Sequence, residues 1–450
     1  MVDLAYSRRD ILRSSVGLAG LTLPTFLNAR AQGVTTRATA KSCIVIYCWG
    51  GISHYESWDP KPDAPVEIRG EFDSIATKTP GIRFSEYLPL MAEHSDKLAI
   101  VRSVHHDQGG HQQGMYISLT GHKLAGGPMS RAKSLSNWPS MAAMISRFHD
   151  PEIGTPGAIR LPYSMYDNGT LMAGEYGGWL GSNYDPILIP TPAGKPFQGV
   201  SRYTGRELKL KLNVKQKRMS QRLSLLQQLD RRVGSETQYD QLDKFRRIAA
   251  DMLIGTGIQE AYDLEREDPR IRQMYGDHIG GQSMLLARRL VEAGVPVVQV
   301  CAGAGDLAGG SGDNWDTHRD HFPKMKRRLL PVFDRSVSAL LTDLEQRGML
   351  EETMVVFLTD FGRTPQVNKN GGRDHYPAVY SMALAGGGIR GGQTYGSSDD
   401  RGIEPASNAC TPGDIHATVY QAMGIDPHTE LLDHLDRPFQ ICDGQPLPLF

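Results

Sequence analysis

Histidines and carboxylates gather in four short segments of the sequence, and each segment directly follows an apolar run. Imidazole nitrogens and carboxylate oxygens are the donors that bind Zn, Mn, Mg or Ca, and such a site needs no thiolate. A lone histidine is more often a surface residue or a hydrogen-bonded core residue, but the convergence of several clusters favours a bound divalent metal ion. The candidate metal ligands are His54, His111, Asp316, His318, His321, Asp360 and His375.

The apolar runs before these segments are typical of strands buried on both faces of a parallel sheet. These four runs cover residues 42–51, 97–104, 295–303 and 353–360, and a fifth run of the same kind covers residues 380–388. Helical periodicity appears between them, and strands that alternate with helices indicate βαβ units. We therefore expect one α/β domain over residues 42–450, with a mostly parallel central sheet and helices on both faces. Ligands bind beyond the carboxyl ends of the strands in such sheets, which is where the histidines and carboxylates fall.

The middle of the chain departs from this pattern. Residues 206–268 are rich in Leu, Lys, Arg, Gln and Glu and contain few turn signals, so they predict one or two long amphipathic helices. We expect a helical insertion over roughly residues 163–281 that packs on the sheet rather than forming an independent domain.

The N-terminal residues 1–31 have the layout of an export signal. Arg8 and Arg9 precede a short apolar stretch, and the small residues near Ala31 suit a cleavage site. The apolar stretch is too short to cross a bilayer, which needs about 20 residues. We therefore expect a signal peptide read by the twin-arginine export machinery, a flexible leader over residues 32–41, and a periplasmic or extracellular protein.

Composition argues against several other classes of protein. The formal net charge is −1, so no basic field favours nucleic acid. No second apolar run reaches transmembrane length, so we expect no stable membrane span. The five cysteines are scattered and form no CxxC pair, which argues against a disulfide scaffold.

Several motifs resemble those of one family. The segments GGISHYESWDPKP, HDQGGHQQGMYISLTG, NWDTHRDHF, FGRTPQVNKNGGRDHYP and LAGGGIRGGQTYG closely resemble the DUF1501 family, exported proteins often labelled sulfatase-like. The order of elements is more remotely similar to the alkaline phosphatase superfamily, which includes sulfatases and phosphodiesterases. This resemblance implies an alkaline-phosphatase-like fold, with Asp316, Asp360, His375 and one of His318 and His321 as metal ligands.

Three positions depart from the superfamily pattern. The first strand of those enzymes ends in a metal-binding aspartate, whereas this chain has Gly50 and Gly51. Phe361 stands where their T-S-D-H-G motif has a histidine. When the segment HQQGMYISLTG is laid on the sulfatase pattern C-x-P-S-R-x-x-x-L-T-G, His111 falls on the nucleophile.

His111 therefore has three alternative roles. It could be a metal ligand in a rebuilt site, with His54 or Glu56 in place of the missing aspartate and metal-bound water as the attacking group. It could itself be the nucleophile, activated by Asp107 or another carboxylate. In the third alternative the site is inactive and the fold serves binding.

The first role predicts an exported hydrolase of a small anionic ester or of a sulfated or phosphorylated glycan. The guanidinium groups of Arg363 and Arg373 would then clamp the anion, because each presents a fork of donors to two oxygens. The chief alternative is a non-catalytic exported binding or assembly protein that keeps the fold but lacks the nucleophile. A redox or metal-carrier protein is the least expected class.

Overall fold

The computed structural model describes residues 38–124, 132–149, 155–167, 170–189, 256–302 and 314–450. The predicted signal peptide, most of the predicted leader and residues 190–255 of the predicted insertion lie outside the described residues. At the end of the leader, backbone hydrogen bonds join Thr39 and Ala40 to Ala422, and Lys41 to Glu352. The leader's predicted flexibility therefore does not extend to these three residues, because their amides pair with the folded domain.

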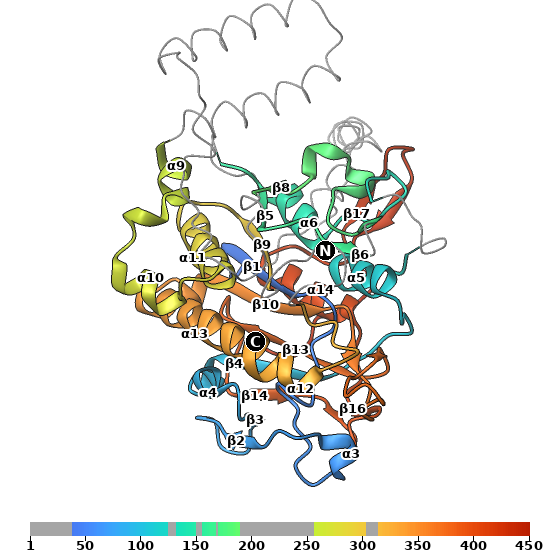
Figure 1. The fold of residues 1–450 in the computed structure, drawn as a ribbon. Helices are drawn as coiled ribbons and strands as arrows, with labels where there is room; N and C mark the ends of the chain where they lie inside the picture. Colours follow the sequence, from blue (N-terminus) through green and yellow to red (C-terminus); the bar gives the residue numbers. More distant parts are fainter. Residues whose placement is uncertain (1–37, 125–131, 150–154, 168–169, 190–255, 303–313) are drawn as a thin grey trace, which may run out of the picture.

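One eight-stranded sheet forms the centre of the molecule (Figure 1). Its order is β14 (Gln393–Tyr395), β4 (Leu98–Val104), β13 (Tyr380–Ala385), β10 (Thr353–Thr359), β1 (Ser42–Cys48), β9 (Val297–Cys301), β5 (Ala158–Leu161) and β8 (Ile187–Leu188). Within this sheet β13 runs antiparallel to both of its neighbours, and every other pair is parallel. All the predicted apolar strands lie in it, so the prediction of a mostly parallel α/β sheet is confirmed.

Helices cover both faces of the sheet. Alternate residues of each strand point to opposite sides, and because both sets are apolar, both faces need to be covered. In β1, Ile44 and Ile46 pack into one hydrophobic core, whereas Val45 and Tyr47 pack into the other. The first core is covered by α11 (Ile279–Glu292) and α13 (Leu330–Gln346), and the second by α5 (His111–Thr120), α6 (Met141–Phe148) and α14 (Pro412–Ala422). Burial on both faces explains why these strands are apolar without alternation.

The described part of the predicted insertion contributes to the sheet itself. Its strand β8 pairs with β5 and forms one edge of the sheet. Two of its helices, α9 (Thr256–Tyr262) and α10 (Pro269–Tyr275), contact α11, and α10 also contacts α13. The segment thus supplies an edge strand as well as helices packed on the sheet.

Shorter elements complete the described fold. They are α3 (Val66–Arg69), α4 (Pro89–Ala92), α12 (His321–Lys324) and the two-stranded sheets β2–β3 (Ser74–Ala76, Arg83–Ser85), β6–β7 (Tyr166–Asp167, Thr170–Leu171), β11–β12 (Gly362–Arg363, His375–Tyr376), β15–β16 (Ser397–Ser398, Pro405–Ser407) and β17–β18 (Glu430–Leu432, Pro438–Gln440). The β11–β12 pair matters most for the site, because it follows β10 and carries two of the predicted site residues.

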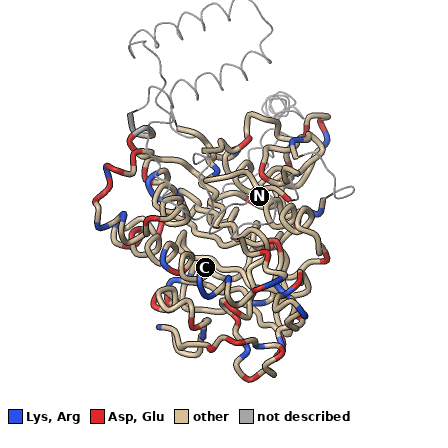
Figure 2. The backbone as a smooth tube through the Cα atoms, viewed as in Figure 1, with Lys and Arg blue, Asp and Glu red and all other residues tan. Residues whose placement is uncertain are grey.

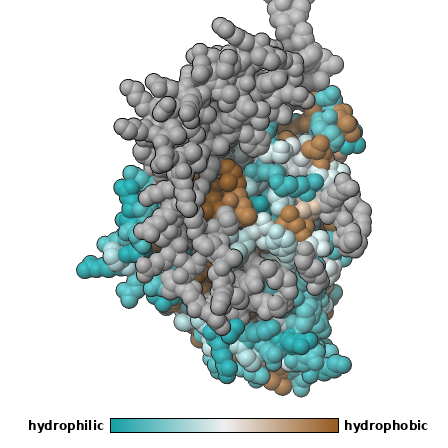
Figure 3. Space-filling view, turned by 45° about the horizontal axis from the view of Figure 1, so that its top comes forward, coloured by the Kyte–Doolittle hydropathy of each residue, from teal (hydrophilic) through white to brown (hydrophobic). Residues whose placement is uncertain are grey.

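Charged residues of both signs occur throughout the described part of the chain. Acidic and basic residues intermix along the backbone (Figure 2), in keeping with the net charge of −1. The face shown in Figure 3 is hydrophilic over most of its described lower part, with a few separate apolar patches. Among the described helices, none combines the length and the apolar character that crossing a membrane requires.

Candidate metal centre

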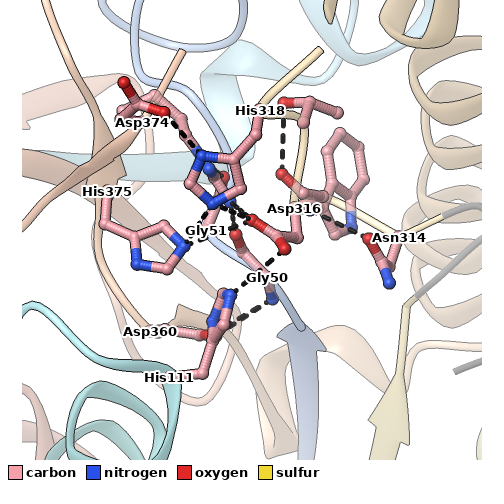
Figure 4. A network of polar contacts seen from close by, with 12 residues as sticks. Gly50, Gly51, His111, Asn314, Asp316, His318, Asp360, Asp374 and His375 are labelled. Atoms are coloured by element: carbon pink, nitrogen blue, oxygen red, sulfur yellow. Dashed lines mark hydrogen bonds and ion pairs between the residues drawn. The ribbon is translucent and has the colours of Figure 1, made fainter. Parts of the chain in front are cut away.

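Segments that follow strands of the central sheet bring four predicted ligand residues together (Figure 4). His111 begins α5, Asp316 and His318 lie between β9 and α12, and His375 begins β12. His111, Asp316 and His375 each offer one ligand atom, and these three atoms lie within 4.8 Å of one another. His318 joins them through its Nε2, which lies 3.0 Å from Asp316 Oδ1. We call these four residues the His–Asp cluster.

Each imidazole of the His–Asp cluster turns its Nδ1 toward an oxygen outside the cluster. The Nδ1 of His111 lies 2.7 Å from Asp360 Oδ2, and that of His318 lies 2.6 Å from Asp374 Oδ1. The Nδ1 of His375 lies 2.8 Å from the carbonyl oxygen of Gly109. Carboxylate and carbonyl oxygens only accept hydrogen bonds, so each Nδ1 donates its N–H. A neutral imidazole then carries its lone pair on Nε2.

The three Nε2 atoms converge on Asp316. They lie 3.0 Å (His318) and 3.2 Å (His375) from Oδ1, and 3.4 Å (His111) from Oδ2. The Nε2 atoms of His318 and His375 are only 2.9 Å apart, and the buried Nε2 of His111 has no hydrogen-bond partner among the described residues. Lone pairs packed against a carboxylate repel one another unless a proton or a metal ion lies between them. Imidazole nitrogens held by acceptors at Nδ1, together with a carboxylate, form a donor set that fits a divalent metal ion.

The contacts within the His–Asp cluster also set its charges. Burial lowers the pKa of His111, but the nearby carboxylates of Asp316 and Asp360 outweigh burial and raise the pKa to about 9. Burial raises the pKa of Asp316, but close contacts with three histidines bring that pKa well below its usual range. Burial lowers the pKa of His375. The arrangement therefore stabilises a positive charge beside Asp316, whether that charge is a proton or a metal ion.

Aromatic rings fix the plane of His111. Its imidazole stacks on Trp49 with ring centroids 5.1 Å apart, and Phe361 lies on another side at 5.2 Å. Phe361 also contacts the ring of His375, with centroids 4.3 Å apart. Phe361 therefore forms an apolar wall against two of the imidazoles.

Gly50 explains why the first strand does not end in an aspartate. Its φ is +105°, and a Cβ at this position would collide with the backbone nitrogen of Asp316. Only glycine adopts this φ readily and leaves room for the neighbouring backbone. The loop of Asp316 therefore packs directly on the end of β1, in the space that a side chain would need.

Arg363 and Arg373 do not form the predicted anion clamp. Both guanidinium groups are fully buried. Arg363 donates to three backbone carbonyls and to Asp316 Oδ1, the last at 2.8 Å. Arg373 donates to the carboxylate oxygen Oε1 of Glu56 at 2.7 Å and to three backbone carbonyls. The protein itself thus occupies their donors, so Arg363 neutralises Asp316 and Arg373 neutralises Glu56.

The predicted ligands His54 and His321 do not join the His–Asp cluster. His321 contacts Glu56 Oε2 at 3.0 Å through its Nε2, and the hydroxyl of Thr317 at 2.6 Å through its Nδ1. His54 Nε2 lies 3.1 Å from the carbonyl oxygen of Gly402. Burial lowers the pKa of both imidazoles, that of His54 to about 4. These residues hold loops together, and neither His54 nor Glu56 takes the place of the missing aspartate.

Asp360 lies behind His111 rather than beside Asp316. Its fully buried carboxylate accepts hydrogen bonds from Tyr47, Gly50 and His111. Asp360 is therefore placed to orient a ligand rather than to be one. It is also the carboxylate that contacts His111, whereas the predicted activator Asp107 pairs with Lys123 at 2.6 Å on the surface.

Asp374 and Tyr47 are two residues of the site whose roles the sequence patterns do not predict. Asp374 directly precedes His375 in the segment GGRDHYP, and an acidic residue beside a candidate ligand is a usable signal. Tyr47 lies within the apolar run of β1, where nothing in the pattern indicates that its hydroxyl reaches Asp360.

The solved structures that match this chain share little sequence with it. Ps i-CgsB is 10% identical with a TM-score of 0.39, and the match covers 90% of this chain and 75% of that chain. The same values hold for its complex with k-i-k-neocarrahexaose, except that the identity is 11%. The PsFucS1 sulfatase from Pseudoalteromonas sp. is 13% identical with a TM-score of 0.33, over 89% of this chain and 71% of that chain. Similarity this low does not extend to activity or substrate.

A family model covers nearly the whole described chain. The comparison with curated proteins finds no match. The family model described as "Protein of unknown function (DUF1501)" matches residues 40–448, a range that includes the whole His–Asp cluster. The resemblance of the motifs is thereby confirmed, and the chain belongs to the DUF1501 family.

Proposed function

We propose that this protein is a metal-dependent hydrolase of a sulfate or phosphate ester. The observation that carries the proposal is the convergence of three Nε2 atoms on Asp316, each imidazole being held at Nδ1 by an acceptor. His111, Asp316 and His375 would hold the ion, with His318 as a further donor beside them. A bound divalent ion supplies a water molecule whose pKa is lowered toward neutrality, which makes it a nucleophile.

The residues of the His–Asp cluster differ in their exposure to solvent, and this difference suits them to different roles. The side chain of His111 is 7% exposed and that of His318 is 43% exposed, so the cluster runs from the protein interior to solvent. His318 can exchange a proton with water at Nε2 while Asp374 holds its Nδ1. Trp49 and Phe361 exclude water from the inner side of His111. The cluster itself offers no hydroxyl or thiol, and both ring nitrogens of His111 face carboxylates, which supports water as the nucleophile over a covalent intermediate.

The surroundings of the cluster favour an anionic substrate. His111 is the first residue of α5, and the N-cap residue Gly110 supplies no side chain to cap the helix. The N-terminus of a helix carries partial positive charge and free backbone N–H groups, which favour sulfate or phosphate. Arg363 adds a buried positive charge beside Asp316. A sulfated or phosphorylated glycan and a small anionic ester both meet these requirements.

Export through the twin-arginine pathway to the periplasm or cell surface is part of the proposal. It rests on the sequence of residues 1–31, in which paired arginines precede a short apolar stretch. Export in the folded state would allow the metal site to form before the protein leaves the cell.

Elemental analysis of the purified protein, followed by turnover of an aryl sulfate and an aryl phosphate, tests this function. We expect near-stoichiometric divalent metal and metal-dependent turnover of one of the two esters. His375→Ala should abolish both, whereas the control His434→Ala, at an exposed histidine, should change neither. Metal without turnover would refute the hydrolase and leave the non-catalytic binding protein, and absence of metal would refute the metal site.

A further inference from the structure

The carboxylate of Asp360 accepts hydrogen bonds from three groups, two of which, Gly50 and His111, lie beside it in Figure 4. Its Oδ1 accepts from the hydroxyl of Tyr47 at 2.8 Å and from the backbone N–H of Gly50 at 3.2 Å. Its Oδ2 accepts from Nδ1 of His111 at 2.7 Å and shares the Gly50 N–H at 3.3 Å. Asp360, Tyr47 and Gly50 are all buried, so water cannot replace a lost partner.

We infer that Asp360 is a positioning residue that fixes His111 as the Nδ1–H tautomer, and that Tyr47 makes a carboxylate necessary for this. The reason is the number of acceptor oxygens. The hydroxyl of Tyr47 needs one oxygen and the imidazole of His111 needs the other, and only a carboxylate offers both. The inference rests on the proposed metal site where it concerns metal affinity, and on the described contacts alone where it concerns the tautomer.

An amide at position 360 has one acceptor oxygen and one NH2 group, so it must choose between two orientations. If the oxygen faces His111, the NH2 group faces Tyr47, and the buried Tyr47 hydroxyl loses its acceptor. A buried polar group without a partner costs about 1–3 kcal/mol. If the oxygen faces Tyr47, the NH2 group donates to Nδ1 of His111. All partners are then satisfied, so the second orientation is favoured.

That orientation moves the proton of His111 to the wrong nitrogen. An Nδ1 that accepts a hydrogen bond leaves the N–H on Nε2, the atom that faces Asp316 at 3.4 Å. An Nε2–H cannot donate a lone pair to a metal ion. Loss of the correct tautomer through an aspartate-to-asparagine change is a known way to disable a histidine while the geometry is preserved.

Removing the Tyr47 hydroxyl should reverse the effect. In the double variant Tyr47→Phe/Asp360→Asn, no donor competes for the amide oxygen on that side, so the amide can turn its oxygen toward His111. The Nδ1–H tautomer then returns. If Asp360 served only to fill space, the substitution Tyr47→Phe would not restore the Nδ1–H tautomer of His111.

Asp374 provides a matched control. It holds His318 as Asp360 holds His111, but one oxygen, Oδ1, accepts from both His318 (2.6 Å) and Asn368 (3.1 Å). Its side chain is 52% exposed. The amide oxygen of Asp374→Asn can therefore keep both contacts, and we expect little change in the tautomer of His318.

The experiment combines Zn2+ affinity, measured by competition with a chelating dye, with long-range 1H–15N spectra of the histidines. The spectra are recorded on metal-free protein over a series of rising pH values, until the His111 signals show an imidazole with a single proton. We expect Asp360→Asn to weaken Zn2+ binding about 10- to 100-fold, to move the His111 proton to Nε2 and to keep a folded spectrum. The double variant should regain affinity and the Nδ1–H signal.

The outcomes separate this inference from the proposed function. Wild-type affinity in Asp360→Asn, an unchanged Nδ1–H signal, or no rescue by Tyr47→Phe would overturn the inference and leave the metal site standing. Failure of the wild-type protein to bind Zn2+ would count against the proposed metal site, while the tautomer spectra would still decide the role of Asp360.

Discussion

Removing the charge of Arg373 tests whether this guanidinium stabilises the fold or binds substrate. In Arg373→Met, Glu56 remains fully buried without the cation that lies 2.7 Å from it. Breaking a buried ion pair from one side typically costs about 3–5 kcal/mol, because an unpaired charge is left inside the protein. We expect a loss of this size in the free energy of unfolding at neutral pH.

The contribution of the Glu56–Arg373 pair to the free energy of unfolding should depend on pH. Burial raises the pKa of Glu56, but Arg373 and His321 together lower it to about 2, below its ordinary value of 4.5. The stabilisation is therefore fully present above pH 4.5 and is lost as the pH falls toward 2. A shift of this size corresponds to about 3 kcal/mol. The difference in stability between the wild-type protein and Arg373→Met should thus be largest at neutral pH and shrink in acid.

Urea unfolding of Arg373→Met, Glu56→Gln and the double variant measures the pair itself. Both Arg373 variants lose the same contacts to backbone carbonyls, so the cycle isolates the interaction with Glu56. We expect a coupling energy above about 1 kcal/mol, with the double variant more stable than the sum of the single losses predicts. Additive losses would refute this reasoning. A near-normal stability combined with a raised KM for an anionic ester would instead restore the anion clamp.

Two further predictions concern the backbone and the pH response. Gly50→Ala should lower the free energy of unfolding by about 2–5 kcal/mol and reduce bound Zn2+, because it adds backbone strain and a collision with Asp316. The control Gly81→Ala has a similar φ of +84°, but its Cβ would lie in open space. Urea unfolding should therefore show a smaller loss of stability, from backbone strain alone, and elemental analysis should show unchanged Zn2+. An equal loss of Zn2+ in Gly81→Ala would contradict the steric argument. Burial raises the pKa of Asp334 to about 6, above its ordinary 3.8, so the folded state binds its proton more tightly and stability should rise as the pH falls through this window. Asp334→Asn should flatten that dependence in urea unfolding at several pH values, and an unchanged slope would assign it to another group.

The sheet and the meeting of the ligands were predictable because both follow from simple patterns. Apolar runs without alternation identify strands buried on both faces, and the polar residues after those runs fall at one edge of the sheet. Spacing alone left open whether His318 or His321 joins Asp316. The structure decides between them because α12 begins at His321, and its imidazole turns toward Glu56 rather than toward the His–Asp cluster.

The roles of the arginines and of Asp360 could not be read from the sequence, because they depend on burial. A guanidinium predicts anion binding only when its donors are free, and the sequence does not show that backbone carbonyls surround Arg363 and Arg373. Likewise, Asp360 follows β10 just as a metal ligand would. Its role changes because His111 lies next to it and takes the position facing Asp316.

Gly50, Asp360 and His111 are physically linked by packing and hydrogen bonds. Gly50 lets the loop of Asp316 pack on the end of β1, and its N–H also binds Asp360. Asp360 in turn contacts His111, whose other nitrogen faces Asp316. A single Gly50→Asp change therefore cannot add a metal-binding carboxylate here, because an aspartate at position 50 would collide with the backbone of Asp316 at a φ that disfavours side chains. Glycine at position 50 and histidine at position 111 therefore depend on each other, because the same packing that excludes a side chain at position 50 places Asp360 against the imidazole of His111.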